Sequence, residues 1–309
     1  MTSIIDISNQ ERENLKSNFK GIYNIPEVIT FINEITSIYN YRYQNLITKV
    51  YYRNNKDKIN IPKIQRVIKR AFQVVNNLNN HKFFTIHLIL SKAKKEFVFD
   101  KIITASNVNS GFTYANGNEI FIFREEEYPK VIIHELLHHQ KLIDNQEFKI
   151  ENKLKLMNHF NINNQTILIL NETIIELWAL ILHLYLISNE YNLSFKDLYD
   201  IEFKYSSLKS YQILKLQETY KNKEWCDKCN IYCYIIFKMI IMSKLHLFLR
   251  NFTYPYDDTA ITNFIIQHSN SLFELNKKRE LPINPQIIIN RKKFQRPINS
   301  LCFMLLSDI

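Results

Sequence analysis

The chain has 309 residues, of which 46% are hydrophobic and 13% aromatic, which is enough apolar material for one large folded domain or two modest ones. Four cysteines are too few for a disulfide-stabilised scaffold of this length. The formal net charge is +10, but lysine and arginine gather only in short clusters, at 63–70, 92–97 and 291–296, so we do not expect a nucleic-acid partner.

The N-terminal part of the chain is predicted to be helical. Its first 20 residues lack the basic segment, apolar run and small-residue cleavage site of a secretory signal, so we expect the protein to stay in the cytosol. Apolar residues then recur at helical spacing over 26–52 and 62–80, and a proline suited to a first helical turn opens each segment. The sequence therefore predicts a helical section over residues 1–80.

After residue 80 the apolar period changes to two, which is the spacing of a strand with one buried face. An Asn-Gly pair at 116–117 favours a tight hairpin turn. We predict strands at 82–90, 96–100, 106–115 and 118–123.

The segment after Pro129 returns to helical spacing through about Leu142 and contains the motif HELLH at 134–138. Residues four apart lie on one face of a helix, so the imidazoles of His134 and His138 can bind one metal ion while Glu135 projects alongside toward a bound water. This geometry is the physical reason for the HExxH spacing of zinc hydrolases. The next residue, His139, points about a hundred degrees away from His138, so we expect it to pack or to face solvent.

A catalytic zinc site also needs a third protein ligand and one open position. The strongly apolar helix predicted at 170–187 carries Glu172 and, one turn later on the same face, Glu176. Two acids on such a helix are costly to bury unless a cation compensates them. We therefore take Glu172 as the first candidate for the third ligand, and Glu176 as the carboxylate that fixes the tautomer of a histidine ligand. The alternative is that both acids face solvent.

Asp144, six residues after His138, is a second candidate, because metzincins place their third ligand at this spacing. Those enzymes need a glycine three residues after the second histidine to turn the chain, and this sequence has Lys141 there. We therefore favour Glu172.

HELLH at 134–138, followed by NETIIE at 171–176, resembles the gluzincins, the thermolysin-like branch of the zincin metallopeptidases. The resemblance covers roughly residues 82–187. It implies an α+β, zincin-like fold with a small mixed or antiparallel sheet, an edge strand, an active-site helix, a second ligand-bearing helix and mostly helical structure elsewhere. It also implies that His134, His138 and Glu172 bind one Zn²⁺, that Glu135 is the general base, and that Glu176 supports a histidine ligand.

The same resemblance places the substrate peptide along an antiparallel edge strand just before the active-site helix. This implies that backbone groups at Asn109, Ser110, Gly111 and Phe112 pair with the substrate. The gap between His138 and Glu172 is longer than in the best-known members, and no downstream motif identifies the residue that steadies the oxyanion. The candidates for that role stay open; they are His246, Tyr254, Tyr256 and His268. A further histidine, His183, lies on the apolar helix, where we expect a core position.

The most apolar stretch, at 231–249, is interrupted by Lys238, Lys244 and His246, which a bilayer centre would penalise. We therefore predict a buried helix there and no transmembrane segment. Cys226, Cys229 and Cys233 lie on one helical face, with His246 further on. A structural zinc site is one interpretation of these cysteines, but the second half of the usual paired spacing is missing, so we favour buried reduced thiols.

Three sections are predicted: a helical section at 1–80, a zincin-like catalytic core at 81–250, and a less regular C-terminal section at 251–309 that packs on the core. The predicted function is zinc-dependent hydrolysis of peptide bonds in a peptide or protein substrate. The alternative is a catalytically silent zincin fold that serves as an interaction or structural protein. The abundance of asparagine, isoleucine and lysine indicates an AT-rich genome, so this alternative includes a viral component, located in the virion or the host cytoplasm.

Overall fold

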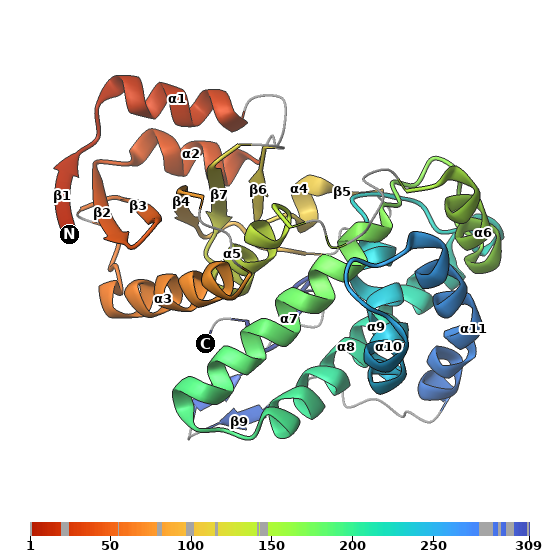
Figure 1. Cartoon of the computed structure of the whole chain (residues 1–309). Helices are drawn as coiled ribbons and strands as arrows, with labels where there is room; N and C mark the ends of the chain where they lie inside the picture. The colour runs from red at the N-terminus through yellow and green to blue at the C-terminus, as the bar shows by residue number, and fades with distance from the viewer. Residues whose placement is uncertain are drawn as a thin grey trace. The chain divides into compact units, whose positions relative to one another are not determined.

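The computed structural model (Figure 1) describes residues 2–19, 25–54, 56–78, 82–96, 102–114, 117–140, 142, 148–277, 287–289, 292–294, 300–307 and 309. The chain divides into two compact units. Unit 1 comprises Met1–Lys95, Asn109–His139 and Ser307–Ile309, and unit 2 comprises Glu96–Val108 and Gln140–Leu306. Together the two units make a mixed α and β protein.

Unit 1 is built on a six-stranded sheet with the strand order β1-β2-β3-β4-β7-β6. The strands are β1 (Thr2–Asp6), β2 (Ser37–Tyr43), β3 (Leu46–Tyr52), β4 (Phe84–Ser91), β6 (Gly111–Thr113) and β7 (Glu119–Arg124). The pairs β3–β4 and β4–β7 are parallel, and the other three pairs are antiparallel. The sheet is therefore mixed, and β6 lies at one of its edges.

Helices cover both faces of this sheet (Figure 1): α1 (Asn9–Phe19) and α2 (Pro26–Glu34) on one, α3 (Ile61–Asn77) and α5 (Tyr128–Leu137) on the other. The second face holds a core in which Val67, Ile68 and Ile132 of the helices pack with Ile86 and Ile122 of the strands. Full burial of such a side chain stabilises a fold by about 1.5–3 kcal/mol. This core fixes α5 against the sheet.

The prediction of a wholly helical section over 1–80 is wrong at Thr2–Asp6, which form β1, and again after residue 34, where β2 and β3 follow. Within the segment 62–80, α3 extends to Asn77, whereas the segment 26–52 forms α2 and then the hairpin of β2 and β3. The hairpin residues are rich in tyrosine, isoleucine, threonine and valine, which fit a pleated surface. Its tight turn uses Gln44, at φ 55°, and Asn45, so no glycine marked the turn in the sequence.

The predicted strands at 82–90 and 118–123 are confirmed as β4 and β7. The predicted strand at 106–115 is correct only over the three residues of β6, because Ala105–Val108 form the short helix α4 of unit 2. Of the predicted strand at 96–100, only Glu96 is described, in a bridge with Ser300. Asn116 of the predicted turn lies outside the described residues.

Unit 2 is mainly helical. Its longer helices are α6 (Ile150–Phe160), α7 (Leu170–Tyr191), α8 (Phe195–Thr219), the π-helix η2 (Tyr232–Phe237), α9 (Lys238–Ser243), α10 (Leu245–Asn251) and α11 (Asp258–Lys277). Shorter elements are η1 (Lys221–Lys223) and two pairs of strands, β5 (Ile103–Thr104) with β8 (Asp227–Lys228), and β9 (Ile287–Ile289) with β10 (Lys292–Phe294). The helix predicted at 170–187 is confirmed as α7. The section predicted as less regular contains α11, a helix of 20 residues.

Helix α7 is long and apolar enough, by composition, to cross a membrane, and 67% of its most apolar window is buried inside the protein. A core helix of a soluble protein meets the same criterion, so composition does not separate the two cases. The single buried helix predicted at 231–249 is instead a π-helical turn, α9 and α10, with a bend of 84° at the break between Ser243 and Leu245. Within it Lys238 is buried, whereas His246 is exposed.

Candidate metal centre

Helix α5 holds the two histidines of the HExxH motif. A proline opens its first turn, and every residue from Tyr128 to Leu137 is buried. The helix ends at Leu137, earlier than the sequence predicts, but His138 keeps helical dihedral angles of φ −60° and ψ −24°. The spacing of four residues therefore still places both imidazoles on one side.

The Nε2 atoms of His134 and His138 lie 3.2 Å apart. Two nitrogens bound to one tetrahedral zinc at about 2.0–2.1 Å would be about 3.3 Å apart. The same distance suits a hydrogen bond between one protonated and one unprotonated ring nitrogen. The pair is thus arranged to share one cation, either a proton or a metal ion.

Glu172 lies in the first turn of α7. Ligand atoms of His134, His138 and Glu172 all lie within 4.8 Å of one another, and this group could hold a metal ion. His134 is buried and the other two are half-buried. No other group of three such ligands occurs within the described residues. The competing ligand Asp144, together with Lys141, lies outside them.

Glu172 accepts a hydrogen bond from the hydroxyl of Tyr234, at 3.1 Å from its Oε2. Tyr234 is buried in η2, and its ring stacks on Phe303 with 4.8 Å between the ring centroids. Insertions that make a π-helical turn often occur at functional sites. The phenol of Tyr234 thus fixes one oxygen of the carboxylate.

Glu135 is 5% exposed and lies beside the edge strand. A Cβ atom added to Gly111 of β6 would be 3.1 Å from Oε1 of Glu135, and 2.9 Å from side-chain atoms of Ile122 and Val131. Only the absence of a side chain at Gly111 lets the strand come this close to α5. The glutamate of the motif therefore lies directly against the edge strand.

The backbone of β6 presents alternate residues to its open edge. The carbonyl of Ser110 accepts from the N–H of Phe123, and Phe112 is paired with Phe121, so these two residues turn their backbone groups toward β7. By alternation Gly111 and Thr113 turn theirs away from β7. The carbonyl of Asn109 accepts from Nε of Arg124 at 2.9 Å. Of the residues predicted to pair with substrate, Gly111 therefore has outward backbone groups, whereas Ser110 and Phe112 do not.

Glu176 is fully buried, and its Oε1 lies 3.4 Å from Nζ of Lys238, which is 1% exposed. The interpretation that both acids of α7 face solvent is therefore wrong for Glu176. The cation near this carboxylate is a lysine from the apolar stretch. Its predicted hydrogen bond to a histidine ligand stays a prediction.

His139 packs inside unit 1. Its Nε2 lies 3.0 Å from the hydroxyl of Thr113, and its ring centroid lies 4.9 Å from that of Phe84. Burial, followed by the nearby His138 and Lys82, lowers the pKa of His139. Of the two outcomes expected for His139, packing or exposure to solvent, the structure shows packing.

The remaining candidates occupy varied environments in unit 2. His183 is fully buried, with Nε2 3.3 Å from the carbonyl oxygen of Leu306, which confirms its core position. Among the oxyanion candidates, Tyr256 accepts from Nε1 of Trp178 at 3.2 Å, Tyr254 is 58% exposed, and His268 packs edge-on against Phe264. None of these contacts involves a predicted metal ligand.

The cysteines behave as thiols. Cys229 and Cys233 are buried and Cys226 is half-buried, and all three are free. Burial raises the pKa of Cys229 and of Cys233 far above the usual range of a thiol. A neutral thiol is a poor metal ligand. Within the described residues these cysteines do not converge into a metal-binding group.

Sequence reasoning missed Tyr234 and the partnership of Lys238. Lysine inside an apolar run is itself a sign that a buried acid lies nearby, so Lys238 could have been paired with an acid of the other apolar helix. No feature of the sequence distinguishes Tyr234 from the other tyrosines, of which the chain has 18 in all. Neither protein-family models nor curated proteins match the sequence when they are compared with it.

Proposed function

We propose that the protein is a zinc-dependent metallopeptidase of the gluzincin type that hydrolyses peptide bonds. The observation that supports this most directly is the approach of His134, His138 and Glu172 to within 4.8 Å of one another. The ligands come from the two sequence motifs that carry the family resemblance. A chance HExxH in a core helix would have no reason to meet an acid from a distant helix.

The donor set fits zinc in a catalytic site. Zinc binds imidazole nitrogen and carboxylate oxygen, and catalytic sites use three protein ligands with one position left open. Two histidines and one carboxylate also bind iron(II) in oxygenases. Glu135, which is buried and next to His134 in the sequence, favours hydrolysis over oxygenation, because a carboxylate there can act as the general base for a water molecule.

The residues of the chain then divide the work. Zinc, when bound, supplies Lewis acidity that polarises a carbonyl group and acidifies water. Glu135 accepts the proton of the attacking water and passes it to the leaving amine. The outward backbone groups of Gly111 and Thr113 align an extended substrate by strand addition. The hydroxyl of Tyr234 donates its one proton to Glu172 and holds that carboxylate in place.

Two neighbouring histidines allow a matched test of metal binding. His138→Gln removes a proposed ligand, whereas His139→Gln changes the adjacent residue, which packs on Phe84. We expect elemental analysis to find about one zinc per chain in the wild type and in His139→Gln, and to find a large loss in His138→Gln. Equal zinc in both variants, or iron in place of zinc, would contradict the proposal.

The activity is tested by profiling cleavage of a proteome-derived peptide library. Glu135→Gln keeps the size of the side chain but cannot accept the proton, so this variant should bind zinc and lose cleavage by several orders of magnitude. A zinc-loaded wild type that cleaves no better than Glu135→Gln would leave the catalytically silent interaction protein as the better description.

A further inference from the structure

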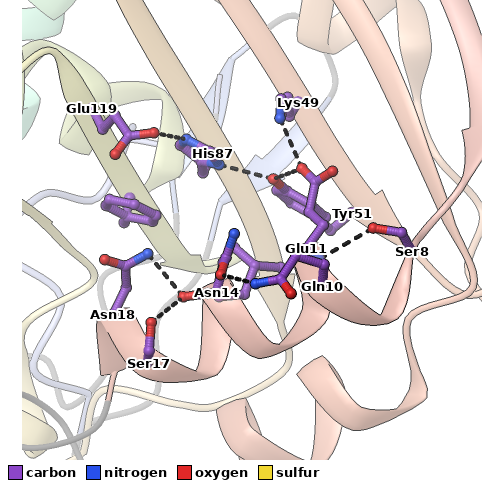
Figure 2. Close-up of a pocket in the computed structure, with 12 residues that line it drawn as sticks. Ser8, Gln10, Glu11, Asn14, Ser17, Asn18, Lys49, Tyr51, His87 and Glu119 are labelled. Atoms are coloured by element: carbon purple, nitrogen blue, oxygen red, sulfur yellow. Dashed lines mark hydrogen bonds and ion pairs between the residues drawn. The ribbon is translucent and has the colours of Figure 1, made fainter.

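Unit 1 contains a polar cavity under helix α1, which covers the opposite face of the sheet from α5 (Figure 1 and Figure 2). Its volume is about 470 Å³, within the range of roughly 300–1,000 Å³ that small-molecule sites occupy. One wall is the polar side of α1, and the other is formed by neighbouring strands β3, β4 and β7. The side chains used below are Gln10 and Glu11 of α1, Lys49 and Tyr51 of β3, His87 of β4 and Glu119 of β7.

A continuous chain of polar contacts crosses the cavity (Figure 2). Oε1 of Glu11 accepts from Lys49 at 2.7 Å and from the hydroxyl of Tyr51 at 3.1 Å. That hydroxyl lies 2.9 Å from Nδ1 of His87, whose Nε2 lies 3.2 Å from Oε1 of Glu119. Tyr51 and His87 are almost fully buried, so the centre of this chain is held in place.

Several acceptor oxygens of this cavity have no donor from the part of the chain that the structure describes. The hydroxyl of Tyr51 donates its one proton to Glu11, and its contact with Nδ1 of His87 then needs the proton to be on that nitrogen. The second carboxylate oxygens of Glu11 and Glu119, and the side-chain oxygen of Gln10, have no hydrogen-bond partner among the described residues. A ligand that brings several N–H donors would satisfy these oxygens.

The charge of the lining favours the same class of ligand. Two carboxylates and one ammonium face the cavity, so the acidic and basic side chains of the lining, Glu11, Glu119 and Lys49, together carry one net negative charge, although the whole chain carries +10. A single metal ion does not fit, because these groups do not converge to metal-binding distance within the described residues. We infer that the cavity binds a small organic cation with several N–H donors, such as a guanidinium compound, with Glu119 as its main anchor.

Free L-arginine and L-citrulline are the matched probes, because a neutral ureido group replaces the guanidinium with little change of shape. Calorimetric titration should give a dissociation constant at least about tenfold lower for arginine than for citrulline, since the charge-assisted bonds are lost in citrulline. The measurement is made on the full chain, with and without zinc, so its result does not depend on the proposed peptidase activity. Equal affinity for the two probes, or no binding of arginine, would overturn the inference.

Variants locate the site. Glu119→Gln should raise the dissociation constant of arginine by roughly tenfold and Glu11→Gln by a smaller factor, because Lys49 already neutralises Glu11. Glu218→Gln is the control, since the side chain of Glu218 is 54% exposed, against 53% for Glu119, and lies in α8. Circular dichroism checks that each variant is folded. A Glu119→Gln variant that binds arginine like the wild type, or a control that weakens equally, refutes the site.

Discussion

Single atoms decide what the HExxH segment can do. The two Nε2 atoms of His134 and His138 face each other at 3.2 Å, while the very next histidine is turned into the sheet against Phe84. Helical geometry explains why His138 and His139 point in different directions, because consecutive residues of a helix point about 100° apart. The same geometry brings Glu135 to the side where Gly111 passes.

Tyr234→Phe tests whether the phenol supports the carboxylate of Glu172. The change removes one hydrogen bond of 3.1 Å and keeps the ring that stacks on Phe303. We expect zinc affinity to fall by up to about tenfold and kcat to fall by about 10- to 100-fold, because the hydroxyl orients a proposed ligand of the metal. Steady-state kinetics at saturating zinc separates the two effects. An unchanged kcat there would remove Tyr234 from the chemistry.

Gly111→Ala tests the close approach of β6 to α5. The new methyl group would meet Ile122, Val131 and the carboxylate of Glu135 at 2.9–3.1 Å. We expect a loss of stability of about 1–3 kcal/mol and a fall in kcat with zinc retained, because the glutamate must move. Ser110→Ala is the control, since the buried hydroxyl of Ser110 has no hydrogen-bond partner within the described residues, so its removal should be nearly neutral. For both variants, denaturant unfolding measures the stability, elemental analysis the bound zinc and steady-state kinetics kcat.

Glu119 gives the protein a predictable response to acid. The hydrogen bond with His87 lowers the pKa of Glu119, although partial burial acts in the opposite direction. A carboxyl whose pKa is lowered by folding stabilises the folded state above its unfolded pKa, and this contribution disappears as the pH falls through the folded value. Below about pH 5 the wild type should therefore lose stability more steeply than Glu119→Gln. Thermal unfolding across pH 3–7 checks this, and parallel curves would contradict it.

At the scale of elements, the apolar helix α7 depends on α9 to bury an acid. Lys238→Met removes the ammonium 3.4 Å from Glu176, and breaking a buried pair in this way costs about 3–5 kcal/mol. Replacing both partners, as in Lys238→Met with Glu176→Leu, should recover most of that loss because no buried charge is left. Chemical denaturation of the two variants makes the comparison. If both are equally destabilised, the pair is not the reason for the cost.

Elements were predictable from the sequence where the deciding information is local. The apolar period that predicts α3, α7 and β4 is a property of nearby residues, and these three elements are confirmed. The spacing of four residues between His134 and His138 is local information of the same kind. The hairpin of β2 and β3 was missed because its turn lacks glycine, and because helix and strand compete for segments rich in isoleucine and tyrosine. Tyr234 was missed because its role depends on a partner 62 residues away.

For the whole molecule, a resident zinc ion should act as a stabilising ligand. An ion that binds only the folded state raises the free energy of unfolding, by about 2.7 kcal/mol when free metal is at a hundred times its dissociation constant. A chelator should therefore lower the Tm of the wild type, and added zinc should restore it. Glu172→Gln, which lacks one proposed ligand, should show a much smaller shift in scanning calorimetry. No difference between the two proteins would mean that the ion does not use this carboxylate.

Two polar contacts, one helical turn apart, join η2 and α9 to α7. Tyr234 meets Glu172, and four residues later Lys238 meets Glu176, also four residues on. Both segments therefore advance in step, and displacement of either by one helical turn would strand two carboxylates at once. The two contacts therefore fix the register of η2 and α9 against α7. An insertion or deletion of even one residue between 234 and 238 should reduce the stability of the protein far more than a substitution there.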